Sequence, residues 1–204
     1  VTLNAETPNC VGERQRTPLH LGAEFNQRNV TLALLAAGAL MAADEIGRTP
    51  LHDAAIEGHL NMTALLLDAG AYIEFPDNIF RTPLHLAARM GRTPVVELLL
   101  DRGAAIQAED GDRRTPLHHS SRSDGLLNTT ALLVSRGASL TAEDDIGFHP
   151  LHYACYENQH GTAVVLLDNG ADMYARDAIG WNPLVHAGAN GYGDLVDLLV
   201  NRVL

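Results

Sequence analysis

The sequence predicts an all-α repeat solenoid, in which short helical units stack one after another. A Thr-Pro-Leu-His tetrapeptide, or a variant of it, begins at residues 17, 49, 82, 115, 149 and 182, which gives spacings of 32, 33, 33, 34 and 33 residues. Apolar stretches of helical pattern follow the tetrapeptides. A period in the low thirties is typical of solenoids, because one such repeat is too small to bury its own apolar face. The 204-residue chain is also 46% hydrophobic and 19% charged, as expected for a folded protein.

The third copy of the tetrapeptide serves as the template for the first helix of each unit. Thr82 precedes Pro83, whose fixed φ suits the first position of a helix. Leu84, Ala87 and Ala88 then supply an apolar stripe. We expect this helix to end near residues 90–91, and the small residues of the stripe should let neighbouring first helices approach closely.

The second helix of the unit begins at Thr93, a suitable N-cap, with Pro94 at the first helical position. Residues 95–100 form its apolar body, and Gly103 ends it. Residues 105–114 return through a polar, acidic turn to the next tetrapeptide. Each unit is therefore predicted to be a helix, a turn, a second helix and a hairpin.

The remaining copies depart from this template at a few places. Residues 1–16 are expected to be the tail of a preceding, expanded finger, and residues 17–204 the repeat domain. The fourth copy carries Ser120 and Ser121 at the small apolar positions and one extra residue between its helices, so we expect it to be locally the weakest. The chain starts without Met and stops within the last copy, from which we expect a segment of a longer protein.

The repeat resembles a known family. Residues 47–59, with the sequence GRTPLHDAAIEGH, followed by residues 65–71, LLLDAGA, are similar to an ankyrin repeat, and the similarity extends over nearly the whole chain. This resemblance implies a curved stack of antiparallel helix pairs with β-hairpin fingers. It also implies that the fingers and the inner helices together form a concave face that binds partners.

Composition argues against several other functions. The net charge of −11 disfavours a surface for nucleic acid, which is bound largely through Lys and Arg. No apolar run reaches the 18 residues of a membrane span, so no membrane insertion by this segment is expected. Two cysteines offer neither a disulfide framework nor metal-ligand spacing, which suits a reducing compartment. We expect an intracellular protein of the cytoplasm, with the nucleus as the alternative.

The five motif histidines invite a search for metal or catalytic sites. They are His20, His52, His85, His118 and His152. Their regular spacing points instead to a structural role, and the resemblance implies that each ring bonds to the motif Thr and to backbone. No nucleophile and base share a recognisable context, and no set of His and Cys has zinc spacing. We therefore expect no enzymatic activity, no cofactor and no metal.

Two series of finger residues are candidates for partner binding. Acidic residues at the turns are expected to form a row along one edge, and we take Asp44, Asp77, Asp112 and Asp145 as its partner-binding candidates. The alternative is that these acids cap or solvate their own turns. The residue just before the tetrapeptide is Arg in four copies and then changes to Phe148 and Trp181. These two aromatic residues either bind a partner or pack against their own fingers.

The family's geometry places the residue before the motif and the eighth and ninth motif positions on the concave face. The candidates that follow are Phe25, Ile56, Arg89, Met90, Arg122, Phe148, Tyr156 and Trp181. Aromatic and Arg anchors usually carry most of the affinity of an interface, so the aromatic residues should matter most.

The chain is thus expected to be a non-catalytic protein-interaction module that binds a peptide or protein domain with basic and apolar residues. The alternative is a regulatory or targeting domain of a larger enzyme, ion channel or ubiquitin-ligase adaptor.

Overall fold

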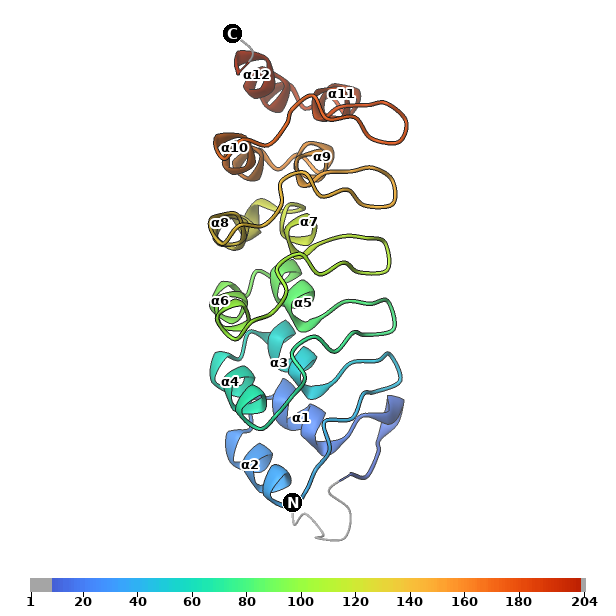
Figure 1. Ribbon diagram of the computed structural model, residues 1–204, viewed down its shortest axis with the longest axis vertical. Coiled ribbons are helices and arrows are strands. Elements are labelled where there is room, and N and C mark those ends of the chain that lie inside the picture. The colour runs from blue at the N-terminus through green and yellow to red at the C-terminus, as the bar shows by residue number, and fades with distance from the viewer. Residues whose placement is uncertain (1–8, 203–204) are drawn as a thin grey trace. The chain divides into compact units, whose positions relative to one another are not determined.

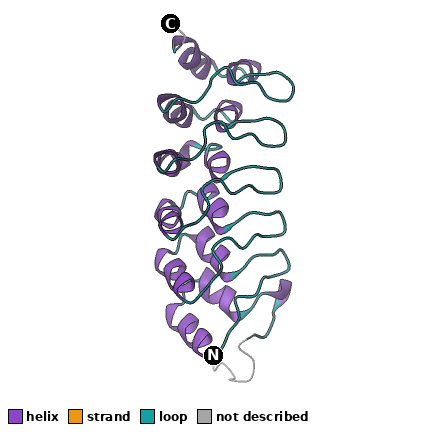
Figure 2. Ribbon diagram, in the orientation of Figure 1, coloured by secondary structure: helices purple, strands orange, loops and turns teal. Residues whose placement is uncertain are grey.

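The computed structural model describes residues 9–202 of the chain (Figure 1). These residues form twelve α-helices and two short 3₁₀ helices and contain no strand (Figure 2). The chain divides into two compact units, one of residues 1–87 and 94–105 and the other of residues 88–93 and 106–204. The helical repeat solenoid predicted from the sequence is confirmed, and each unit is described separately below.

The first unit contains the first repeats of the chain. Its elements are η1 (Glu13–Gln15), α1 (Pro18–Glu24), α2 (Arg28–Ala36), α3 (Pro50–Glu57), α4 (Leu60–Asp68), most of α5 (Pro83–Arg89) and most of α6 (Thr93–Asp101). Helix α1 packs against α2 and α3, and α3 packs against α4. Leu19, Leu51 and Leu66 are fully buried in the core that these helices share. Helices α2 and α4 lie on the side away from the projecting loops, and we call them the outer helices (Figure 1).

The second unit repeats this arrangement. Its elements are α7 (Pro116–Ser120), η2 (Asp124–Leu126), α8 (Leu127–Ser135), α9 (Pro150–Tyr156), α10 (His160–Asp168), α11 (Pro183–Ala189) and α12 (Gly193–Asn201). Helix α9 packs against α10 and α11, α8 packs against α10, and α11 packs against α12. The extra residue of the fourth copy is accommodated by η2, which follows the shortest helix, α7. Whether this repeat is the weakest stays a prediction.

The motif histidines brace the start of the first helix in the first five copies, as the resemblance implied. In the second copy, the backbone N–H of Thr49 donates to Nδ1 of His52 at 3.0 Å, and the Thr49 hydroxyl lies 2.9 Å from the same nitrogen. Because Nδ1 accepts from backbone, the ring carries its proton on Nε2, which donates to the carbonyl of Arg81 at 3.2 Å. That carbonyl belongs to the next copy, so the imidazole joins two consecutive repeats.

The fingers are loops in the described residues, and the predicted β-hairpins are not seen there. In the finger before α3, the N–H of Asp44 donates to the carbonyl of Arg48, and the N–H of Gly47 donates to the carbonyl of Asp44. These two bonds close one turn but do not extend into a ladder. The expected tail of a preceding finger, residues 1–16, falls partly outside the described residues.

Candidate partner-binding surface

The second unit exposes two aromatic side chains on the side of the fingers. Tyr156, the last residue of α9, is 48% exposed, and Trp181, two residues before α11, is 40% exposed. Both rings contact the ring of His186, with centroid distances of 5.9 Å for Tyr156 and 5.3 Å for Trp181. We call Tyr156, Trp181 and His186 the aromatic patch. The sequence predicted its two exposed members but not the histidine that joins them.

The backbone of Trp181 is held in place from three directions. Its N–H donates to the carboxylate of Asp177 at 2.8 Å, and its carbonyl accepts from the N–H of Asp177 at 2.9 Å and from Nε2 of His152 at 3.3 Å. His186 is fixed as well, because its Nε2 lies 2.7 Å from the other carboxylate oxygen of Asp177. The patch therefore rests on an ordered support, which lowers the entropy lost when a partner binds.

Phe148 does not belong to this surface. Its side chain is only 7% exposed and contacts the rings of His152, Tyr153 and His186, with centroid distances of 5.3, 5.2 and 4.9 Å. Phe148 stands where the earlier copies have Arg before the motif, and its side chain packs between two consecutive repeats. Of the two alternatives raised from the sequence, packing within the fold holds for Phe148.

Arg122 and Glu157 lie near the aromatic patch. The guanidinium of Arg122 is 5.3 Å from the centroid of the Tyr153 ring and donates to the Glu157 carboxylate at 2.9 Å. Arg114 approaches the same ring at 5.6 Å, and its Nε bonds to the Tyr153 hydroxyl at 2.8 Å. The exposed Arg122 is therefore oriented by two neighbours, while Tyr153 itself is buried.

The predicted row of surface acids is not formed, because the first aspartate of each finger is buried. These residues are Asp44, Asp77, Asp110, Asp144 and Asp177, all at most 9% exposed. In each of them one carboxylate oxygen accepts the N–H groups of the residues two and four positions later, for example Ile46 and Arg48 at 3.0 and 2.8 Å from Asp44. Asp44 and Asp77 are thus turn caps rather than partner-binding groups. Asp112 and Asp145 are exposed and remain candidates.

A second series of contacts was missed from the sequence. In the last three repeats the other oxygen of the finger aspartate is bound by the residue nine positions later, near the start of the following helix. His119 lies 2.8 Å from Asp110, the hydroxyl of Tyr153 lies 2.5 Å from Asp144, and His186 contacts Asp177 as described. The sequence did contain a signal for these contacts, because the residue directly after the tetrapeptide is polar or aromatic in the last three repeats.

Hydrogen bonds lower the pKa of three finger aspartates, Asp77, Asp110 and Asp177. Burial alone would raise the pKa of Asp110, but hydrogen bonds from His119 and from the backbone of Arg114 and Asp112 outweigh it and lower the pKa to about 2. The pKa values of Asp77 and Asp177 are lowered in the same way, against the effect of burial. The carboxylates of these finger turns therefore have their hydrogen-bond donors within the protein.

The candidates of the first unit lie apart from any aromatic patch. Phe25 is 61% exposed at the end of α1, and the half-buried Ile56 lines a small charged pocket of about 130 Å³. In this pocket Arg16 bonds to Glu24 at 2.8 Å and to Asp53 at 2.6 Å. Arg16 thus neutralises two of the carboxylates that line the pocket.

Arg89 and Met90 belong to the second unit and are exposed where α5 ends. Arg89 is near enough to His119 to contribute to lowering the pKa of that ring, although burial is the larger cause. Both residues remain candidates for partner contact.

The described residues offer few features of a metal-binding or catalytic site. Within 9–202, no group of three or more His, Cys, Asp or Glu side chains is arranged to hold a metal ion. Burial raises the pKa of the Cys155 thiol to about 12, which makes it a poor nucleophile. In the same part of the chain, every helix is too short or too polar to cross a bilayer.

Comparison with known proteins agrees with the repeat geometry. None of the curated proteins matches the chain. A family model described as ankyrin repeats (3 copies) matches residues 2–77 and 75–144, and one described as ankyrin repeats (many copies) matches residues 151–200. Since these matches span most of the sequence, the chain belongs to the ankyrin repeat family, whose repeats generally serve as protein-interaction modules.

Proposed function

We propose that this chain is a non-catalytic module that binds a peptide or protein domain across its fingers and inner helices, with the aromatic patch as the main anchor. The observation that carries the proposal is the exposure of Tyr156 and Trp181 above the fixed ring of His186. Large aromatic side chains on an ordered support are typical of the residues that dominate interfaces.

The partner is proposed to contribute an apolar group to the patch and basic groups around it. Asp112 and Asp145 are exposed on neighbouring fingers, where the N–H of Asp145 donates to the carbonyl of Asp112 at 3.1 Å. The whole chain carries a net charge of −11, which favours the approach of basic partners. The free thiols of Cys10 and Cys155 fit a reducing compartment, so we place this partner in the cytoplasm or nucleus.

Magnitudes favour the aromatic patch over the charged residues as the source of affinity. An exposed ion pair contributes ~0.2–1 kcal/mol. Truncating a well-packed aromatic anchor can cost ~2 kcal/mol or more. The acidic residues should therefore mainly affect the rate of association.

The test is capture of partners from a cell extract with the chain as bait, followed by titration of the captured partner. Trp181→Ala should weaken binding by about 30-fold or more, which corresponds to ~2 kcal/mol, while the thermal midpoint stays near wild type. Tyr174→Ala is the matched control, because Tyr174 is an aromatic residue of the same unit, 60% exposed and outside the patch. Wild-type affinity in the Trp181 variant, or equal losses in both variants, would contradict this assignment.

A further inference from the structure

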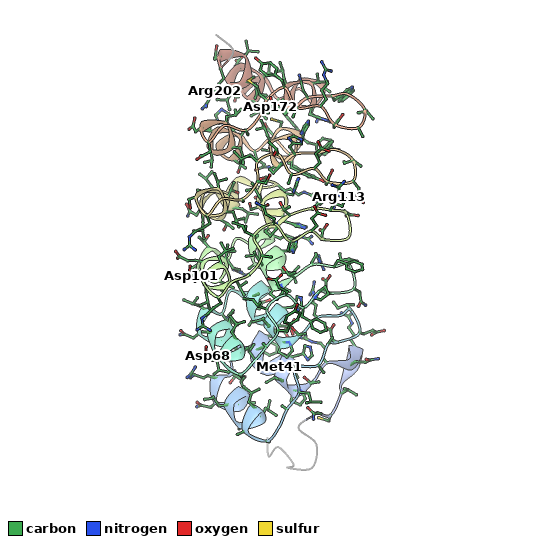
Figure 3. The ribbon with its side chains drawn as sticks, viewed as in Figure 1. Met41, Asp68, Asp101, Arg113, Asp172 and Arg202 are labelled. Atoms are coloured by element: carbon green, nitrogen blue, oxygen red, sulfur yellow. The ribbon has the colours of Figure 1, made fainter. Side chains whose placement is uncertain are left out.

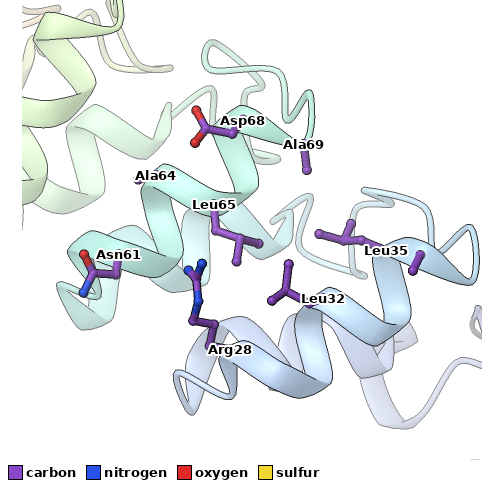
Figure 4. A pocket seen from close by; sticks show the side chains of 9 residues that line it. Arg28, Leu32, Leu35, Asn61, Ala64, Leu65, Asp68 and Ala69 are labelled. Carbon is purple, nitrogen blue, oxygen red and sulfur yellow. The ribbon is translucent and has the colours of Figure 1, made fainter.

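The first unit has an apolar groove on its outer helices, on the side away from the fingers. It lies between α2 and α4 and has a volume of about 590 Å³ (Figure 4). Leu32 and Leu35 of α2 and Leu65 of α4 form its apolar part. Arg28 extends from α2 toward α4 at one end, where Asn61 also lines the groove. Leu32 is 44% exposed, Leu35 is half-buried and Leu65 is 8% exposed, so a partner would reach the apolar floor mainly through Leu32.

Two alanines stand beside the groove where α4 and α6, and α10 and α12, carry an ion pair. The last residue of α4, Asp68, pairs with Arg102 just after α6 at 2.7 Å. In the second unit, the last residue of α10, Asp168, pairs in the same way with Arg202 at 2.6 Å. Figure 3 shows Asp68 and Arg202 on the outer helices.

The residues at the corresponding positions of α2 and α4 are Ala36 and Ala69, and both line the groove. The two charged side chains that pair between α4 and α6 and between α10 and α12 are therefore missing beside this groove.

Two charged side chains line the groove, Arg28 and Asp68. Among the described residues, Arg28 takes part in no ion pair, whereas Asp68 is already paired with Arg102. The guanidinium of Arg28 and the side-chain amide of Asn61 both offer N–H donors at the same end. The groove therefore combines an apolar floor with a site for a carboxylate.

We propose that this groove binds an acidic amphipathic helix of another protein, with apolar side chains on Leu32, Leu35 and Leu65 and a carboxylate on Arg28. An amphipathic helix laid into an apolar groove between two helices is a common form of recognition. The site is separate in its residues from the aromatic patch and does not depend on the function proposed for that patch.

The experiment uses two synthetic helical peptides of about fourteen residues that share one leucine face. One carries Glu on its flanks and the other carries Lys at the same positions. Binding to the full chain is followed by fluorescence anisotropy and by methyl NMR shifts. The Glu peptide is expected to bind at least tenfold more tightly than the Lys peptide and to shift the methyl signals of Leu32, Leu35 and Leu65.

Two variants test the geometry. Arg28→Glu should remove the preference for the Glu peptide, whereas Arg176→Glu, the same charge reversal at an exposed finger residue, should keep it. The double variant Ala36→Asp, Ala69→Arg builds the ion pair seen at Asp68 and Arg102, which should close the groove without loss of fold and weaken binding of the Glu peptide at least tenfold. Trp181→Ala should bind the Glu peptide like wild type, which separates this site from the aromatic patch.

Three results would overturn the proposal. They are equal binding of the two peptides, unchanged binding by the double variant, and shifts confined to residues outside the groove. Sedimentation that shows a dimer of the wild type but not of the double variant would assign the groove to a second copy, and would equally overturn it.

Discussion

Within each unit, the motif histidine joins its own repeat to the next one. Its Nδ1 accepts a backbone N–H at the start of the helix, and its Nε2 donates to a carbonyl of the next repeat, as in the bonds from His118 to Thr115 and Phe148. Only the neutral ring can make both bonds, because a protonated ring has no acceptor. Burial lowers the pKa of His52, His118 and His152 to about 4.

This chemistry predicts a loss of stability in mild acid. These histidines have a lower pKa in the folded protein, about 4, than the ordinary 6.5 of the unfolded chain, so the unfolded state binds protons first as the pH falls. The contribution of these histidines to the free energy of unfolding should be complete above pH 6.5 and decrease between pH 6.5 and about 4. It should change little at lower pH. Urea unfolding across this range should show a decrease of the order of 1 kcal/mol or more per histidine.

The finger aspartates provide an internal control for the pH experiment. The pKa values of Asp77, Asp110 and Asp177 are lowered from 3.8, so their contribution is complete above that pH and is lost only as the pH falls further. A decrease between pH 6.5 and 4 therefore reports the histidines. A free energy of unfolding that stayed constant from pH 7 to pH 5 would contradict their role.

At the scale of elements, the fingers are joined to one another by single backbone bonds. The N–H of Asn78 donates to the carbonyl of Ile46 at 3.1 Å, and in the second unit the N–H of Ala178 donates to the carbonyl of Ile146 at 3.0 Å. Gly47 and Gly147, which follow the two isoleucines, have φ values of 80° and 74°. A Cβ on Gly47 would lie 2.6 Å from the N of Asn78, so the finger contact depends on glycine there.

Two glycine substitutions distinguish the stability lost through this finger contact from the stability lost through backbone strain. Gly47→Ala combines the strain of a left-handed residue with a clash against the next finger, whereas Gly70→Ala, at φ 90°, meets nothing within 4 Å. Left-handed strain alone costs ~1–2 kcal/mol. We expect Gly70→Ala to lose that amount and Gly47→Ala to lose at least ~1 kcal/mol more through the clash. Chemical unfolding measures both, and equal losses would show that the fingers do not need the close approach.

At the scale of the whole molecule, the sequence predicted the repeat fold more fully than the binding surface. The period and the positions of Pro and Gly are local patterns, and they were sufficient to place the helices. The burial of Phe148 depends on His186, which lies in the next repeat and departs from the motif, so spacing alone could not reveal it. The caps formed by Asp44 and Asp77 depend on the path of the backbone through the turn. The groove at Ala36 and Ala69 likewise appears only when consecutive repeats are compared in space.

The stacking of repeats also predicts that core mutations act locally. Leu51 is fully buried in a core shared with α1 and α4, and Leu151 of α9 is 1% exposed in the second unit. Replacing either by Ala should cost ~2–5 kcal/mol through the cavity left behind. In a solenoid each repeat contacts only its neighbours, so the loss should be felt first by the adjacent helices.

Hydrogen exchange measured by mass spectrometry tests this locality. Leu51→Ala should accelerate exchange in α1, α3 and α4 with a smaller change in α9 to α11, and Leu151→Ala should show the reverse pattern, because α9 packs on α10 and α11. Leu40→Ala, at a residue 62% exposed, controls for removal of a leucine without a cavity and should leave both patterns unchanged. Equal acceleration of all helices by either core variant would mean that the chain opens as one cooperative body, and the nearest-neighbour description of its stability would then be wrong.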